Sequence, residues 1–170
     1  TPLQNNNQFN IVSGQVRVNA DIQNFGNVDT QSGDLFNRTG IVLNTGIFTA
    51  NTGSSINGVV DSGFTIQPAG VLNLLAPTVF SPAMQLILNE GIILNAQNLT
   101  IPDIFDINGG LIAGDGIFKI PPSATVTSFG GFLTGLTFAG ASAATPLTVL
   151  NDGAFIWTDG ISRFNDITLT

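Results

Sequence analysis

Short apolar segments recur along the chain, and several of them directly follow a glycine. Within these segments residues two positions apart share a face, as Ile117 and Lys119 do in 117–120 (IFKI), which is typical of a β-strand with one inward and one outward face. Successive segments lie 23, 28, 19, 21 and 22 residues apart, and the spacing of 28 is attributed to an insertion around 77–82. The pattern therefore predicts a repeat of about 22 residues. Its six units begin at Gly40, Gly63, Gly91, Gly110, Gly131 and Gly153.

Each unit contains further short strands separated by glycine corners. In five of the six units a second glycine follows the first after four to seven residues, and a second apolar strand comes next. Asp-Gly and Asn-Gly pairs at 57–58, 108–109, 115–116 and 159–160 are typical of tight corners. A third strand follows a Pro-, Ser- or Ala-rich corner, as at 124–127. Three strands in about 22 residues predict one coil of a β-solenoid.

The predicted fold class is all-β, a parallel β-helix (β-solenoid) of about six to seven coils. Residues 40–170 are expected to form the solenoid repeats, and residues 1–39 an extended N-terminal segment with an atypical first coil. The alternative is an antiparallel β-sandwich, because Asn-Gly and Asp-Gly pairs are also strong hairpin signals. The recurring pair of glycines favours the solenoid, since a sandwich has no reason to repeat it.

One stretch also carries a family resemblance. The segment 110–127 (GLIAGDGIFKIPPSATVT) resembles the degenerate repeat units of bacterial surface β-helices, namely autotransporter passengers and filamentous-haemagglutinin-like adhesins. The resemblance is one of composition and period and covers about 40–170. It implies a right-handed parallel β-helix on a cell surface, in a scaffold or adhesion role, and it brings no set of functional residues.

Composition excludes several classes of function. Only 9% of the 170 residues are charged, and the chain has no His and no Cys, so catalytic triads and His- or Cys-based metal sites are excluded. Four Lys and Arg at a net charge of −7 argue against a nucleic-acid partner. No apolar run approaches the ~18 residues of a membrane span. These features favour a secreted or cell-surface protein, and the initial Thr suggests a processed, trimmed or partial chain.

Carboxylates are the remaining candidates for chemistry. Asp103 and Asp106 are the closest local pair for glycoside hydrolysis, and Asp152 and Asp159 could approach across a corner. We interpret these side chains as turn caps instead, and we expect no enzymatic activity and no cofactor. Structural calcium at corner residues Asp115, Asp152 and Asp159 is a weaker hypothesis. The Asn-x-Thr sequences at Asn37 and Asn98 are interpreted as chance matches rather than glycosylation sites.

The edges of the solenoid are the strongest functional candidates. The sequence shows no capping helix, and uncovered edge strands invite pairing with another copy. We therefore expect a non-enzymatic structural subunit that assembles with copies of itself into a filament or surface layer, through 1–18 and 153–170. The alternative is an adhesin that binds surface glycan, with Trp157 as a platform. The predicted interface residues are Phe9, Ile11, Val12, Val16, Val18, Ile167 and Leu169.

Overall fold

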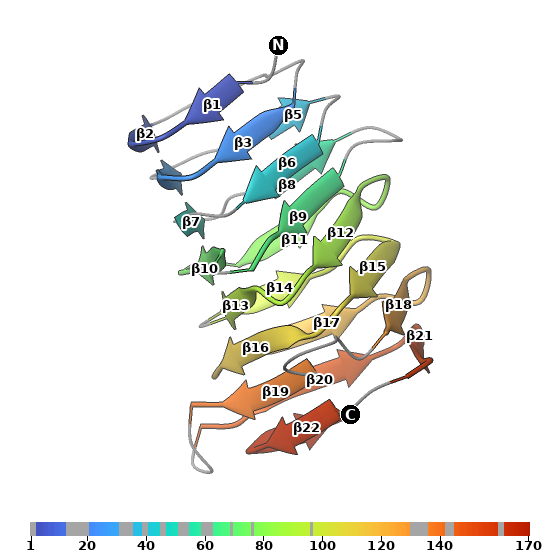
Figure 1. The fold of residues 1–170 in the computed structure, drawn as a ribbon. Helices are drawn as coiled ribbons and strands as arrows, with labels where there is room; N and C mark the ends of the chain where they lie inside the picture. Colours follow the sequence, from blue (N-terminus) through green and yellow to red (C-terminus); the bar gives the residue numbers. More distant parts are fainter. Residues whose placement is uncertain are drawn as a thin grey trace.

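The protein is all-β, and its strands are stacked in three parallel sheets (Figure 1). The structure, a computed structural model, describes residues 3–12, 21–30, 36–38, 41–44, 47–50, 55–58, 63–68, 70–75, 77–95, 97–129, 136–141, 145–159 and 162–170. Within these ranges, residues 11, 29–30, 36–58 and 136 are described by their backbone alone. The described residues contain strands and turns but no helix.

Consecutive strands lie in different sheets, so each passage of the chain around the axis adds one layer. Sheet A contains β1 (Leu3–Asn5), β3 (Ile22–Asn24), β6 (Ile41–Asn44), β9 (Gly63–Ile66), β12 (Gln85–Leu88), β15 (Ile104–Ile107), β18 (Thr125–Ser128) and β21 (Ala154–Trp157). Sheet B contains β2 (Gln8–Ile11), β4 (Asn27–Thr30), β7 (Ile47–Ala50), β10 (Val71–Leu74), β13 (Ile92–Asn95), β16 (Gly110–Gly114), β19 (Leu136–Gly140) and β22 (Ser162–Asn165). Sheet C contains β5 (Phe36–Arg38), β8 (Ser55–Gly58), β11 (Thr78–Phe80), β14 (Asn98–Thr100), β17 (Ile117–Ile120), β20 (Leu147–Asn151) and β23 (Ile167–Leu169).

The pairing of these strands decides between the two predicted folds. Every pairing between described strands is parallel, and each joins a strand to one that follows it about one repeat later. Gly63 of β9, for example, pairs with Gln85 of β12, 22 positions on. An antiparallel sandwich would require hairpins, so the β-solenoid is confirmed and the sandwich is wrong.

The predicted phase of the repeat is wrong, although the strands themselves are present. Gly63 lies at the start of β9 in sheet A, whereas Gly91 directly precedes β13 in sheet B. Their spacing of 28 therefore spans one coil of 22 residues plus β12 and the corner after it, and 77–82 is not an insertion. β11, which lies within 77–82, belongs to an ordinary coil, because Thr78 pairs with Leu99, 21 positions on. The first strand of the unit expected at Gly131 lies outside the described residues, whereas its second and third strands correspond to β19 and β20.

The longer coils come later in the chain. Thr137 pairs with Arg163, and Phe118 pairs with Val149, which are separations of 26 and 31 residues. Near the N-terminus, β1 to β4 pair in parallel and extend sheets A and B without a break. Figure 1 accordingly shows the N-terminus at one end of the stack and the C-terminal strands β21 and β22 at the other.

The core consists of columns of side chains that run along the axis. Alternate residues of each strand point inward, so residues in register on successive strands stack on one another. Leu86 of β12 pairs with Phe105 of β15, and Phe105 with Val126 of β18, and all three are fully buried. Apolar burial of this kind is the main stabilising contribution, at about 25 cal/mol per Å² removed from water.

Aromatic rings form one continuous row within this core. The Phe118 ring lies 6.0 Å from that of Phe105 and 5.8 Å from that of Phe138, measured between centroids. Phe138 in turn stacks on Phe164 at 5.4 Å with an interplanar angle of 3°, and lies 6.2 Å from Phe155. The row therefore reaches from the middle of the solenoid to its last coil.

One core column contains a buried hydroxyl that weakens it. Ser128 is fully buried in register with Ile107, and its Oγ has no hydrogen-bond partner among the described residues. Leaving a polar group buried without a partner costs about 1–3 kcal/mol. We expect Ser128→Ala to raise the free energy of unfolding by about 1 kcal/mol, measured by urea denaturation. The outward Thr127→Ala is the control, and a Ser128→Ala protein less stable than wild type would contradict the expectation.

Candidate assembly interface

The last coil, β21 to β23, ends the core columns with exposed side chains. Trp157, Phe164 and Leu169 are 51%, 47% and 65% exposed. Their register partners one coil earlier are Ser128, Phe138 and Val149, and all three are buried. The three exposed residues thus occupy inward-facing positions, and they are open to solvent because no described strand lies on the outer edge of the last coil.

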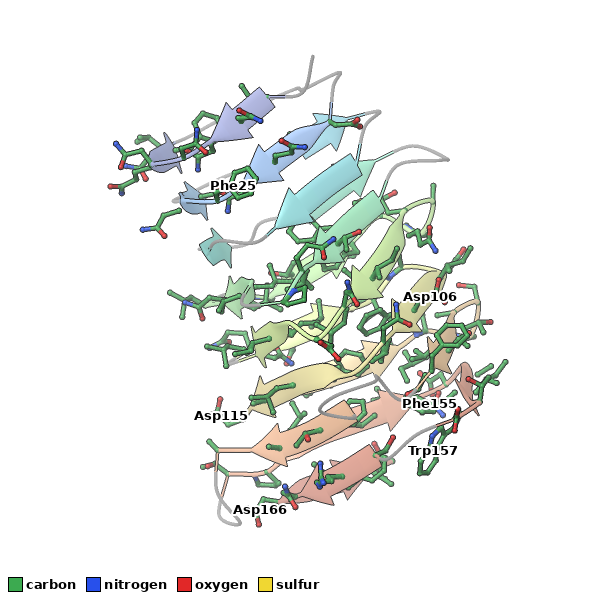
Figure 2. The ribbon with its side chains drawn as sticks, in the orientation of Figure 1. Phe25, Asp106, Asp115, Phe155, Trp157 and Asp166 are labelled. Carbon is green, nitrogen blue, oxygen red and sulfur yellow. The ribbon has the colours of Figure 1, made fainter. Side chains whose placement is uncertain are left out.

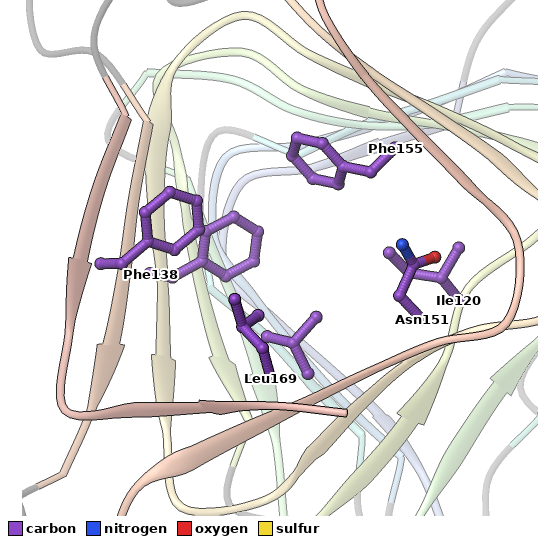
Figure 3. Close-up of a pocket in the computed structure, with 7 residues that line it drawn as sticks. Ile120, Phe138, Asn151, Phe155 and Leu169 are labelled. Atoms are coloured by element: carbon purple, nitrogen blue, oxygen red, sulfur yellow. The ribbon is translucent and has the colours of Figure 1, made fainter.

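A cavity opens in the last coil beside Phe164 and Leu169 (Figure 3). Its volume is about 180 Å³. Phe138 and Phe155 flank it, and Asn151 contributes a polar side chain. An engineered apolar cavity of about 150 Å³ holds a benzene molecule, so this space is large enough for one apolar side chain. The remaining lining residues are Ile120, Val149, Phe164 and Leu169.

The first coil exposes the other end of the same columns. Leu3 of β1 is 44% exposed, although its register partner Ile22 is buried. Phe9 of β2 is partly buried and packs against the core. A second inward column begins with asparagines, and Asn5 Nδ2 donates to Asn24 Oδ1 at 2.8 Å. Such amide ladders fix the register of stacked strands.

The predicted interface residues fall into three groups. Phe9, Ile167 and Leu169 lie at inward-facing positions of the end coils. Val12 lies just after β2 and is 65% exposed, and Ile11 is described by its backbone alone. Val16 and Val18 lie outside the described residues.

Sequence reasoning missed three further inward-facing apolar residues of the end coils. Leu3, Phe155 and Phe164 were not proposed, because their strands were not aligned with the preceding coils. Trp157 was considered only as a sugar platform. The missing signal was register: once β22 is aligned with β19, Phe164 falls directly on the buried Phe138.

The candidate catalytic carboxylates bind separate partners on neighbouring coils. Asp106 lies on the outer face of β15 (Figure 2), where its Oδ2 accepts a hydrogen bond from Gln85 Nε2 at 2.7 Å. Asp103 lies in the turn before β15, and its Oδ1 accepts from Ser123 Oγ at 2.6 Å. Both carboxylates therefore link adjacent coils through side-chain hydrogen bonds. The expected turn-cap role is wrong for Asp106, which lies within β15.

The hypothesised calcium ligands do not meet. Asp115 lies at the corner between sheets B and C, Asp152 between C and A, and Asp159 between A and B. β21 also separates Asp152 from Asp159, so these two do not approach across one corner. Among the described residues no group of three or more potential metal-binding side chains is found. The proposed calcium site is therefore wrong for these three residues.

Trp157 presents an exposed ring with its polar atom already bound. Its Nε1 donates to the carbonyl oxygen of Asp159 at 2.7 Å. Figure 2 places Trp157 near Phe155, at the C-terminal end of sheet A. The indole is thus held at the terminus of the column that contains Leu88, Ile107 and Ser128.

Comparison with family models, curated proteins and solved structures finds no match for this chain. Among the described residues no helix is long and apolar enough to cross a membrane.

Proposed function

We propose that this protein is a secreted, non-enzymatic structural subunit that assembles with copies of itself into an extracellular filament or surface layer. The observation that carries the proposal is the last coil. Three of its inward-facing residues, Trp157, Phe164 and Leu169, are about half exposed or more. Their strands form the ends of their three sheets. An uncovered edge with an exposed apolar face is a template for another β-coil.

Low charge supports the same proposal. With 9% charged residues, the chain has little electrostatic repulsion to keep copies apart in solution. Parallel coils also need no charged pairs to fix their register, because stacked amides and aliphatic side chains do so, as at Asn5 and Asn24. Edge pairing can proceed by stacking of whole coils or by donation of the N-terminal strand.

We also propose the handedness, the number of coils and the location of the solenoid. The repeat spacing suggests six to seven complete coils. The resemblance to bacterial surface β-helices implies a right-handed helix displayed on a cell surface. The extracellular location follows from composition, and the four cations argue against a nucleic-acid partner.

Self-assembly is tested on the purified 170-residue chain. We expect light scattering coupled to size exclusion to give masses that rise with concentration above the monomer value. Negative-stain micrographs should then show rods or sheets. A chain that stays monomeric at millimolar concentration would contradict the proposal.

A second candidate function is a glycan-binding adhesin module. The exposed ring of Trp157 favours it, because sugars stack on aromatic faces. Binding to immobilised surface polysaccharide that is lost in Trp157→Ala and kept in Phe25→Ala, an exposed aromatic residue of another coil, would support this candidate. Binding that is equal in both variants would exclude Trp157 as the platform.

A further inference from the structure

The two end coils present the first and last positions of the same columns. In sheet A one column begins at Leu3 and ends at Phe155. In sheet B another begins at Phe9 and ends at Phe164. A coil placed beyond Phe155 and Phe164 must therefore bring apolar side chains at these two register positions, and β1 and β2 carry them.

The edges are also compatible in direction and charge. Within a parallel sheet the outer edge of the first strand is complementary to the outer edge of the last, so a second copy continues the sheet when it stacks head to tail. Strands β1, β2 and β21 contain no charged residue. The charge on β22 is Arg163, whose column begins at the uncharged Gln8. Within β1 and β2, no charge of the same sign faces it.

On these grounds we propose that copies stack coil on coil, β1 of one copy on β21 of the next and β2 on β22. Leu3 then covers Phe155, and Phe9 covers Phe164, in the register of the internal coils. This inference rests on the proposed self-assembly and specifies its interface and polarity. Because the contact is heterologous and does not close on itself, it extends into a filament.

The cavity of the last coil receives side chains of the first coil of the next copy. Its 180 Å³ lie at the end of the core columns, where a further coil places its inward side chains. Phe155 and Phe164 both line it, and both lie at the register positions that Leu3 and Phe9 extend. Filling it restores the dense packing found elsewhere in the core.

One other surface competes with the end coils. On the outer face of sheet B, Val71, Ile92 and Leu111 form a partly exposed apolar column. Copies that associate side by side through this face would also form large particles. The experiment therefore has to separate end contacts from lateral ones.

Charge substitutions at the two ends supply that separation. Leu3→Lys places an ammonium group on the first coil, and Phe164→Lys places one on the last, where stacking would bury it without a partner. The matched control is Ile156→Lys, since Ile156 is 47% exposed, as is Phe164, but faces outward from the same coil. We expect each end variant to associate at least about 100-fold more weakly than wild type, and the control to assemble normally.

Mixing the variants tests the polarity. Leu3→Lys keeps an intact last coil and Phe164→Lys an intact first coil, so an equimolar mixture should give dimers and nothing larger in sedimentation velocity. If Leu3→Lys dimerises alone, the contact joins like ends and the inference is overturned. If both variants polymerise like wild type, assembly is lateral, and the inference fails while the proposed function stands. Should wild type never assemble, both fail.

A disulfide lock distinguishes stacking from strand donation. Gln4 and Gln23 are in register on the outer faces of β1 and β3, and Gln4 Nε2 donates to Gln23 Oε1 at 2.8 Å. In the double variant Gln4→Cys and Gln23→Cys an oxidised bridge prevents β1 from leaving its own solenoid. We expect the oxidised protein to polymerise as the reduced protein does. Polymerisation only after reduction would mean strand donation and would overturn the stacked interface.

Discussion

Replacing Phe118 with alanine should lower the free energy of unfolding by about 3–5 kcal/mol. The ring is fully buried and lies within about 6 Å of both Phe105 and Phe138, measured between centroids. Its loss removes apolar contacts and leaves a void in the middle of the aromatic row, where coils on both sides prevent collapse. Urea denaturation followed by circular dichroism measures the change.

Its neighbour provides the control for this prediction. Ile117 precedes Phe118 on β17 but points outward and is exposed. Ile117→Ala should therefore change the free energy of unfolding by less than about 0.5 kcal/mol. Equal losses for Ile117→Ala and Phe118→Ala would contradict the assignment of inward and outward faces on this strand.

Replacing Gly116 with alanine should also destabilise the fold, by about 1–3 kcal/mol. Gly116 lies at the corner between β16 and β17, and its backbone nitrogen donates to the Asn95 carbonyl at 3.0 Å. A Cβ there would overlap the backbone carbonyl oxygen of Gln97 in the coil below. Because the obstacle is backbone, the corner can relieve the overlap only by separating the two coils.

Gly63 separates this steric effect from glycine's general backbone entropy. A Cβ at Gly63 would lie 3.4 Å from the Gln85 carbonyl oxygen, which is an ordinary contact. Gly63→Ala should leave the melting temperature unchanged or raise it slightly, because alanine restricts the unfolded chain. If differential scanning calorimetry gave the same decrease for both variants, close approach of the coils would not be the reason for Gly116.

The strands could be predicted from the sequence because their period is local. Segments 71–74 and 117–120 are predicted with the bounds that β10 and β17 have, since alternation along four residues is enough to define a face. The parallel pairing also followed, because the glycine spacing recurs without hairpin symmetry.

The phase of the repeat could not be predicted because glycine suits every corner. Gly63 and Gly91 look equivalent in the sequence, yet they belong to sheets A and B. The phase is set by which side chains stack across coils, as Phe138 does on Phe164. These two residues lie 26 positions apart in the sequence. The pattern within either strand therefore does not show which residues stack on each other.

The sequence predicted an interface at the end strands and named some of the inward-facing residues there, such as Phe9 and Leu169. The C-terminal strands were expected to form an interface through their edges. Leu169 lies on this edge as expected. Phe155 and Phe164 were missed because the sequence does not show the register of their strands with the preceding coil. The corner aspartates were grouped together, although they lie at different corners.

Cryo-electron microscopy of the assembled protein tests the central claim most directly. Sheets A and B hold eight strands each, and stacked strands are about 4.8 Å apart. End-to-end stacking therefore predicts filaments with strands perpendicular to the axis, a 4.8 Å layer spacing and an axial subunit repeat of about 38 Å. A protein that remains monomeric, or filaments in which the solenoid axis lies across the fibre, would contradict the account.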